Sequence, residues 1–302
     1  MRQLKEESLT FLPRKILEEK IRKFLEEDLG QGDITTLLTV PSGTIVEAEI
    51  VAKESGVIAG IEEVFTLLES FGFQVRVLVS DGSRVEGKAA VLKIVGDART
   101  LLSIERTLLN LLMRMSGIAT ATSRLIEKIR RAGYKTRIAC TRKVAPGLLY
   151  FDKRAVMLGG GDTHRLHLDD LIIVKDNHLM VVGDVGEAVK RVREAVSFSK
   201  KIEIEVSSDN EALEAAKAGA DIVMLDNFSP QQIKNTMVLL DREGLRSKVL
   251  IEASGGINEQ NVLEFAATGV DILSFGEITD SAKALDMSLE VVKVRKSKTK
   301  KV

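Results

Sequence analysis

The 302-residue chain lacks the features that mark several large classes of protein. It has a single cysteine, Cys140, so no disulfide framework can form within it, and this composition fits a reducing cytoplasm. Its 44 lysine and arginine residues balance 44 acidic residues, so no overall field favours nucleic acid or an anionic membrane. Any electrostatic function must therefore be local.

Long apolar runs are also missing. No uninterrupted run approaches the ~20 apolar residues of a membrane span, and the N-terminal MRQLKEESLTFLPRK has no secretory signal. The basic C-terminal run KVRKSKTKK could bind a polyanion, but it is more typical of a solvated chain end. We therefore expect a cytoplasmic protein with one large or two medium domains.

The sequence changes character at about residue 105. Alternating segments such as TIVEAEIVAKE predict a small α+β domain over residues 1–104. Over residues 105–280, short β-branched runs alternate with amphipathic segments, which predicts about six parallel strands with right-handed crossovers. These strands form either a doubly wound sheet or a barrel. Residues 281–302 are predicted to pack back on the N-terminal domain and to end in the basic tail.

Polar or glycine residues stand where each predicted strand ends. They are Arg142, Lys143, Lys175, Glu205, Asp226, Ser254, Gly255, Gly256 and Gly276. The carboxyl ends of parallel strands open on one side, so we expect these residues to converge. A polar strand end is ordinary by itself, but two lysines, two acids and two glycine-rich turns together favour a binding site.

The positive charge in residues 141–178 needs a partner. His164 and Arg165 join the cations at the strand ends, and packing cations together is unfavourable unless anions lie between them. The guanidinium group matches a carboxylate with two parallel hydrogen bonds. The pattern predicts a small ligand with several carboxylates and phosphates. Lys153 and Arg154, on FDKRAVM, are interpreted instead as salt-bridge partners of nearby aspartates.

The glycine turns and the acids suit the rest of such a ligand. Ser254-Gly255-Gly256 and Gly276 offer bare backbone N–H groups for a phosphate. Glu205 and Asp226 suit Mg²⁺ held together with a substrate phosphate, or sugar hydroxyls. A zinc site has too few ligands, and no glycine-flanked nucleophile stands near a histidine.

Taken together, these motifs resemble one family. TRK-x-x-PGL, GGGDTHR, KDNH, E-x-E-V, LDNF and SGGI, in this order, resemble quinolinate phosphoribosyltransferase, also called nicotinate-nucleotide pyrophosphorylase (carboxylating). EDLGQGDIT and IERTLLN extend the resemblance over nearly the whole chain. It implies an N-terminal α/β sandwich and an incomplete, open α/β barrel, in homodimers or higher oligomers with shared active sites. The implied reaction, in NAD biosynthesis, converts quinolinate and 5-phosphoribosyl 1-pyrophosphate into nicotinate mononucleotide, pyrophosphate and CO₂, with Mg²⁺.

The resemblance also implies roles for individual residues. The residues implied to hold the quinolinate carboxylates are Arg142, His164, Arg165 and Lys175, with Arg106 reaching into the site of a second copy of the chain. Those implied in catalysis are Lys143, Lys175, Glu205 and Asp226, of which Glu205 and Asp226 also face the ribose hydroxyls and Mg²⁺. Those implied at the 5′-phosphate are Ser254, Gly255, Gly256 and Gly276, and Val144 and Phe275 complete the substrate-binding positions.

The chain departs from the family pattern in three places. Val144 and Leu149 stand where the family usually has threonine and arginine. GEITDS replaces the common G-A-L-T-H-S, which brings Glu277 and Asp280 close to the expected phosphate. Two acids repel a phosphate unless they are turned away or neutralised by a neighbour.

Two other functions fit parts of the pattern. A sister phosphoribosyltransferase would use nicotinate or another aromatic acid without decarboxylation, and a paralogue linked to molybdate uptake shares some motifs. KDNH and GGGDTHR favour the quinolinate form. A non-catalytic phosphate- or nucleotide-binding barrel protein has no need of Lys143, Glu205 and Asp226 together, so we expect an enzyme.

Overall fold

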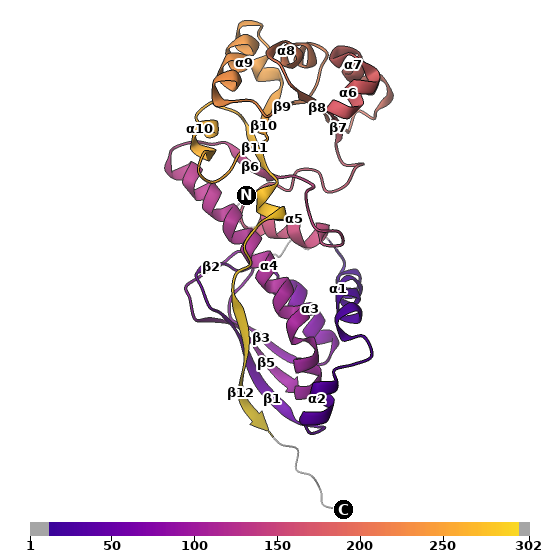
Figure 1. Ribbon diagram of the computed structural model, residues 1–302, viewed down its shortest axis with the longest axis vertical. Helices are drawn as coiled ribbons and strands as arrows, with labels where there is room; N and C mark the ends of the chain where they lie inside the picture. Colours follow the sequence, from indigo (N-terminus) through magenta and orange to yellow (C-terminus); the bar gives the residue numbers. More distant parts are fainter. Residues whose placement is uncertain (1–11, 296–302) are drawn as a thin grey trace, which may run out of the picture. The chain divides into compact units, whose positions relative to one another are not determined.

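The computed structural model describes residues 12–295, which form two compact units (Figure 1). Of the described residues, 12–120 and 283–295 make the first unit, and 121–282 make the second. The division falls within helix α4 (Ala98–Arg131), so the change of sequence character at about residue 105 lies inside this helix. The basic tail beyond residue 295 lies outside the described residues. None of the described helices is both long and apolar enough to cross a bilayer.

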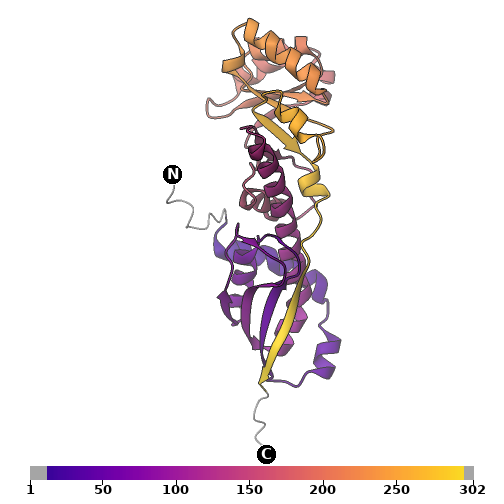
Figure 2. The same ribbon diagram turned by 90° about the vertical axis from the view of Figure 1, so that its left-hand side faces the viewer.

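The first unit is built on a four-stranded antiparallel sheet in the order β12-β1-β5-β3. Strand β12 (Met287–Arg295) pairs with β1 (Ile45–Ala52) along its length, and the two run side by side in both ribbon views (Figures 1 and 2). The C-terminal segment thus forms an edge strand of the sheet. The other strands of this unit are β2 (Gly56–Val57), β3 (Gln74–Val77), β4 (Arg84–Val85) and β5 (Ala89–Asp97).

Helices complete the core of the first unit. Helix α1 (Arg14–Leu29) buries Leu17, Ile21 and Leu25 and packs against α3 (Ile61–Ser70). Each fully buried side chain of this kind contributes about 1.5–3 kcal/mol. The short α2 (Ile34–Thr39) is capped by Asp33, whose carboxylate accepts from the Thr36 N–H at 3.0 Å.

The second unit is an open sheet of six parallel strands in the order β6-β11-β10-β9-β8-β7. Strands β6 and β7 follow one another in the chain but lie at opposite edges, so the barrel is incomplete. The expected fold, an α/β sandwich and an open barrel of about six strands, is confirmed. The strands of the barrel are β6 (Arg137–Cys140), β7 (Ile172–Val174), β8 (Ile202–Val206), β9 (Ile222–Asp226), β10 (Leu250–Ser254) and β11 (Ile272–Phe275).

Helices alternate with these strands. They are α5 (Leu149–Leu158), α6 (Asp176–Val182), α7 (Val185–Ala195), α8 (Asp209–Lys217), α9 (Pro230–Arg242), the 3₁₀ turn η2 (Arg246–Lys248), α10 (Val262–Ala266) and α11 (Glu277–Asp280). Side-chain caps fix where several of them begin. Ser208 caps α8, and Ser229 with Gln232 forms a capping box at α9.

The connections AGAD (residues 218–221) and TGVD (residues 268–271) have the same local structure. Gly219 and Gly269 have φ of 93° and 85°, the left-handed conformation in which many helices end. The aspartate that follows then ties its strand to the preceding one. Asp221 accepts from the Ile202 N–H, and Asp271 from the Ile251 N–H, each at 2.8 Å. These bonds help fix the register that aligns the strand ends.

Candidate active site

A cavity of about 790 Å³ opens among the carboxyl ends of the barrel strands. The strand register explains which side chains meet there. Glu205 lies beside Met224, and Met224 beside Glu252, while Asp226 lies beside Ser254 and Ser254 beside Ser274. Side chains two residues apart share a face of a strand, so these two rows both face the cavity. All six residues line it.

Most of the residues singled out in the sequence are brought together here. The predicted residues that line the cavity are Arg142, Lys143, His164, Arg165, Lys175, Glu205, Asp226, Ser254, Gly255, Gly256 and Gly276. Three are not among its lining residues. Val144 lies in the loop after β6, and Phe275 is buried at the end of β11 with 1% exposure. Arg106 is exposed on the part of α4 that belongs to the first unit.

The cations come from three separate segments. Arg142 and Lys143 follow β6 and are exposed, while His164 and Arg165 lie in the long β6–β7 connection. The Arg165 side chain donates to the Leu171 carbonyl at 3.2 Å, and burial, followed by the charge of Arg142, lowers its pKa. The charges of Arg142 and Arg165 thus repel each other at one cavity, and an anion bound between them would relieve this repulsion.

Lys175 links this group to the acids. Its ammonium group donates to Glu205, at the end of the neighbouring strand β8. The Glu205 side chain is 13% exposed and that of Lys175 is 43% exposed, so the pair lies at the cavity wall rather than in open solvent. A ligand that binds either group competes with this ion pair.

Lys153 is a further lining cation, and its side chain bonds backbone carbonyls instead of the nearby aspartates that the sequence suggested. The residue is 1% exposed, and it donates to the backbone carbonyls of Thr163 and Cys140. Burial is the main cause that lowers its pKa. Because Cys140 precedes Arg142 and Thr163 precedes His164, this ammonium group ties together the two segments that carry cations. Arg154, the other residue that was interpreted as the partner of an aspartate, is also fully buried.

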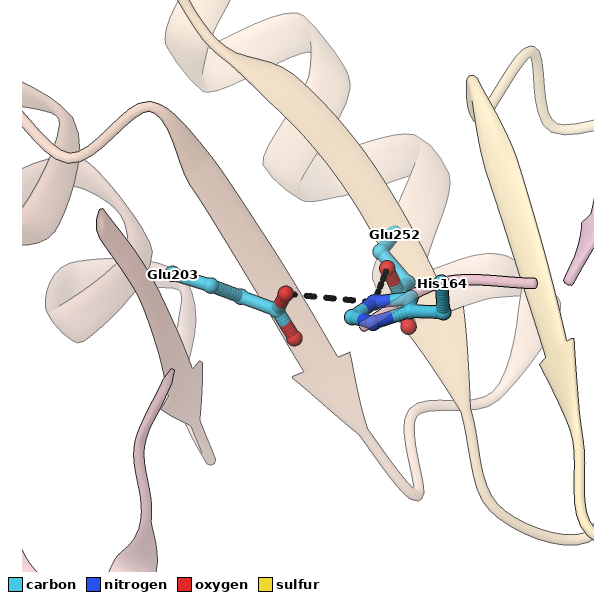
Figure 3. A group of neighbouring side chains, drawn as sticks. All are labelled: His164, Glu203 and Glu252. Atoms are coloured by element: carbon cyan, nitrogen blue, oxygen red, sulfur yellow. Dashed lines mark hydrogen bonds and ion pairs between the residues drawn. The ribbon is translucent and has the colours of Figure 1, made fainter. Parts of the chain in front are cut away.

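Beneath the cations lies a buried group of His164, Glu203 and Glu252 (Figure 3). The imidazole Nε2 is 3.2 Å from Glu203 Oε2 and 3.1 Å from Glu252 Oε2. Both carboxylates are fully buried, and the His164 side chain is 10% exposed. Burial alone would lower the pKa of His164, but the carboxylates of Glu203 and Glu252 beside its ring outweigh burial and raise the pKa to about 10. Burial in turn raises the pKa of Glu203.

Turns after β9 and β10 also line the cavity. Gly255 and Gly256 have φ of 91° and 65°, and a Cβ atom on Gly255 would lie 2.2 Å from Asn227 Oδ1. Asn227 is itself left-handed, and its backbone N–H donates to the Ser254 carbonyl at 2.8 Å, which ties the two turns together. The backbone here is bare and closely approached, as a phosphate seat requires.

Gly276 lies between a cation and an acid. A Cβ atom built on it would lie 2.9 Å from Lys143 Cδ and 3.0 Å from Asp280 Oδ2. Glu277 and Asp280 are both exposed and both line the cavity. The acids noted as departures in the sequence are therefore not turned away from the cavity, and Lys143 is the cation beside them.

Comparison with known proteins agrees with this architecture. Residues 33–116 match the N-terminal domain, and residues 118–290 the C-terminal domain, of quinolinate phosphoribosyl transferase. The chain belongs to the quinolinate phosphoribosyltransferase family. The two matched stretches together cover most of the chain, so the family assignment does not depend on the barrel alone.

Individual members of the family are similar throughout. A probable nicotinate-nucleotide pyrophosphorylase [carboxylating] of Methanothermobacter thermautotrophicus is 49% identical over 271 residues, covering 90% of this chain and 97% of the relative. A similarly named protein of Methanocaldococcus jannaschii is 46% identical and covers 90% and 96%. The solved nicotinate-nucleotide pyrophosphorylase of Francisella tularensis superposes with a TM-score of 0.85 at 35% identity, over 93% of this chain and 97% of that one.

Proposed function

We propose that the protein is a quinolinate phosphoribosyltransferase (decarboxylating). It transfers the phosphoribosyl group of 5-phosphoribosyl 1-pyrophosphate to quinolinate and releases nicotinate mononucleotide, pyrophosphate and CO₂. The observation that carries the proposal is the single cavity that collects Arg142, Arg165 and Lys175 together with the left-handed Gly255-Gly256 turn. A dicarboxylate and a phosphorylated sugar are the ligands that such a combination matches.

The cations orient the acceptor. Arg142, Arg165 and Lys175 bind the two carboxylates, with His164 assigned beside them by family resemblance. The ring nitrogen of quinolinate is thereby aimed at the anomeric carbon, which removes much of the entropic barrier. The C–N bond forms as the bond to pyrophosphate breaks, and Lys143 neutralises the departing charge.

The two acids serve the sugar side. Glu205 and Asp226 bind the ribose hydroxyls and stabilise the positive charge that develops on the ribose. Their oxygens are also the hard ligands that Mg²⁺ prefers, so the donor set fits a magnesium ion shared with the pyrophosphate. When bound, this ion supplies charge neutralisation to the leaving group. The adjacent carboxylate then leaves as CO₂, and the electron pair that stays on the ring carbon, stabilised by the neighbouring pyridinium nitrogen, takes up a proton.

The proposal includes a homodimer in a cytoplasmic setting. Arg106 contributes to the cavity of a second copy of the chain, as family resemblance suggests, and its exposure on α4 leaves it accessible for that role. Higher oligomers of such dimers are compatible with the same contact.

One assay tests the reaction itself. The protein is incubated with quinolinate, 5-phosphoribosyl 1-pyrophosphate and Mg²⁺, and the release of CO₂ and nicotinate mononucleotide is measured, with nicotinate as a parallel acceptor. We expect both products from quinolinate in equal amounts. Product from nicotinate alone would favour the sister transferase instead.

A further inference from the structure

Both ring nitrogens of His164 are engaged by the protein itself. Nε2 faces the two buried carboxylates at 3.1 and 3.2 Å, while Nδ1 accepts a hydrogen bond from the backbone N–H of Arg165 at 2.8 Å. The ring therefore offers no free N–H to a ligand in the cavity. This arrangement raises the question of how His164 acts on a substrate at all.

The protonation state of the ring follows from these contacts. The acids favour a second ring proton, as the raised pKa of His164 expresses, whereas the contact with Arg165 needs a lone pair on Nδ1. The hydrogen-bond geometry decides between them, because a backbone N–H can only donate. The single ring proton is thus on Nε2. The side-chain N and O atoms of His164, Glu203 and Glu252 that could bind a metal ion lie within 4.8 Å of one another, but a protonated Nε2 has no lone pair for such an ion.

The Nε2–H group of His164 lies near two carboxylates, and only Glu252 accepts a hydrogen bond at each of its two oxygens. Its Oε2 accepts from His164, and its Oε1 accepts from Ser274 Oγ at 2.5 Å. Neither oxygen of Glu203 has a hydrogen-bond partner among the described residues. Ser274, Glu252, His164 and the Arg165 amide therefore form one hydrogen-bonded chain, here called the relay, that runs from β11 through β10 to the β6–β7 connection. Figure 3 shows its central bond, between Glu252 and His164.

We propose that Glu252 and Ser274 are positioning residues, which hold His164 in the tautomer that binds the Arg165 amide and thereby fix Arg165 at the cavity. His164 has φ of 51°, an uncommon conformation for a residue other than glycine, which the surroundings must maintain. The relay supplies such a restraint at one end, and the Asp162 carboxylate, which accepts from the His164 N–H at 2.8 Å, supplies another. The expected change in KM for quinolinate rests on the proposed function, whereas the tautomer of His164 does not depend on it.

Two substitutions together should break the relay. In Glu252→Gln, the amide oxygen still accepts from His164, and the Ser274 hydroxyl can rotate to accept from the new NH₂ group. In the double variant with Ser274→Ala, that NH₂ group loses its acceptor. It then either stays unsatisfied or turns toward His164, where it drives the ring proton to Nδ1 and breaks the bond to Arg165.

Kinetics should show this coupling. We expect each single variant to raise the KM for quinolinate a few-fold, and the double variant to raise it on the order of tenfold beyond the product of the two. The KM for 5-phosphoribosyl 1-pyrophosphate should change much less. Glu203→Gln is the matched control, because Glu203 is as buried and as close to Nε2 but accepts no bond. It should leave the KM for quinolinate nearly unchanged.

The tautomer can be measured without any activity. In ¹⁵N NMR spectra of the labelled protein at neutral pH, the His164 signals are those that His164→Asn removes. We expect a protonated Nε2 and an unprotonated Nδ1 in the wild type, and a changed pattern in the double variant. This measurement on the wild type holds even if the double variant fails to fold.

The possible results separate cleanly. A protonated Nδ1 in the wild type would overturn the proposal. So would a double variant whose increase in KM for quinolinate equals the product of the two single increases. A Glu203→Gln variant with the same increase would overturn it too. If the NMR pattern is as expected but the wild type does not turn over quinolinate, the proposed function fails and the assignment of the tautomer stands.

Discussion

Two regions around the cavity hold their acids differently. Beside His164, Glu203 and Glu252 are fully buried and reach no solvent. Beside Gly276, Glu277 and Asp280 are exposed. A buried charge acts in a low dielectric and is strongly felt by its neighbours, whereas an exposed one is screened by water and salt. The first pair should therefore shape the site, and the second only tune it.

The largest expected effect tests whether the active site needs Arg106 from a second copy of the chain. Arg106→Ala and Lys143→Ala should each lower kcat/KM by about 10²–10³ as pure dimers, because each removes a charge that stabilises the transition state. If Arg106 serves a second copy, a mixed dimer has one intact site. After random exchange half the dimers are mixed, so activity should return to roughly a quarter of wild type.

Native mass spectrometry supplies the control for that experiment, because it shows whether the subunits have exchanged. Full exchange without recovery of activity would show that Arg106 does not act across an interface. The cavity of the second unit would then have to bind its dicarboxylate with its own residues alone.

The preference for one aromatic acid over another should follow from the cations of the cavity. We expect kcat/KM for quinolinate to exceed that for nicotinate by about 10²-fold or more, because a missing carboxylate leaves cations without partners. Steady-state assays with both acids at saturating 5-phosphoribosyl 1-pyrophosphate measure this ratio. Equal values for the two acids would contradict the assignment of quinolinate.

Binding measurements can also separate the residues that bind quinolinate from those that bind the phosphoribosyl ligand. Arg165→Ala should weaken quinolinate at least about tenfold and leave 5-phosphoribosyl 1-pyrophosphate nearly unaffected, since it removes one partner of a charged pair. Asp226→Ala should mainly weaken the phosphoribosyl ligand and its dependence on Mg²⁺. Calorimetric titration of each ligand compares them, after thermal melts exclude unfolding, because Asn227 donates to Asp226 in its turn. Equal losses for both ligands in both variants would refute the division.

The smallest effect is expected beside Gly276. Asp280→Asn should lower the KM for 5-phosphoribosyl 1-pyrophosphate about two- to threefold at low salt, because it removes a repulsive but exposed charge near Gly276. The gain should fade as the ionic strength rises. Glu194→Gln, on α7 and outside the cavity lining, is the control for a general change of charge. A raised KM in Asp280→Asn would mean that Asp280 helps to bind the ligand.

The sequence predicted strand ends better than strand interiors. Lys175, Glu205 and Asp226 were identified because hydrophobic runs stop at them and parallel strands align their ends. Glu252 and Ser274 were missed, because each lies within a run, VLIEA and DILSF, that otherwise predicts only a buried strand. A charged residue inside such a run was the available signal.

Lys153 shows a second limit of the sequence. On the helix FDKRAVM it stands in a charged cluster, which usually indicates a solvated face. Its burial depends on carbonyls supplied by Thr163 and Cys140, whose approach is a property of the tertiary structure. The acids of GEITDS were noted, but only the structure shows that Asp280 Oδ2 approaches Gly276.

The ion pair between Lys175 and Glu205 has a consequence for how two ligands share the cavity. The first ligand to arrive, whether it takes the ammonium group or the carboxylate, must separate the pair, and the second then finds its own partner already released. By thermodynamic linkage, each ligand should raise the affinity for the other by the same factor. Titrations of a single substrate would then underestimate its affinity in the ternary complex, and the cooperativity would arise within one chain.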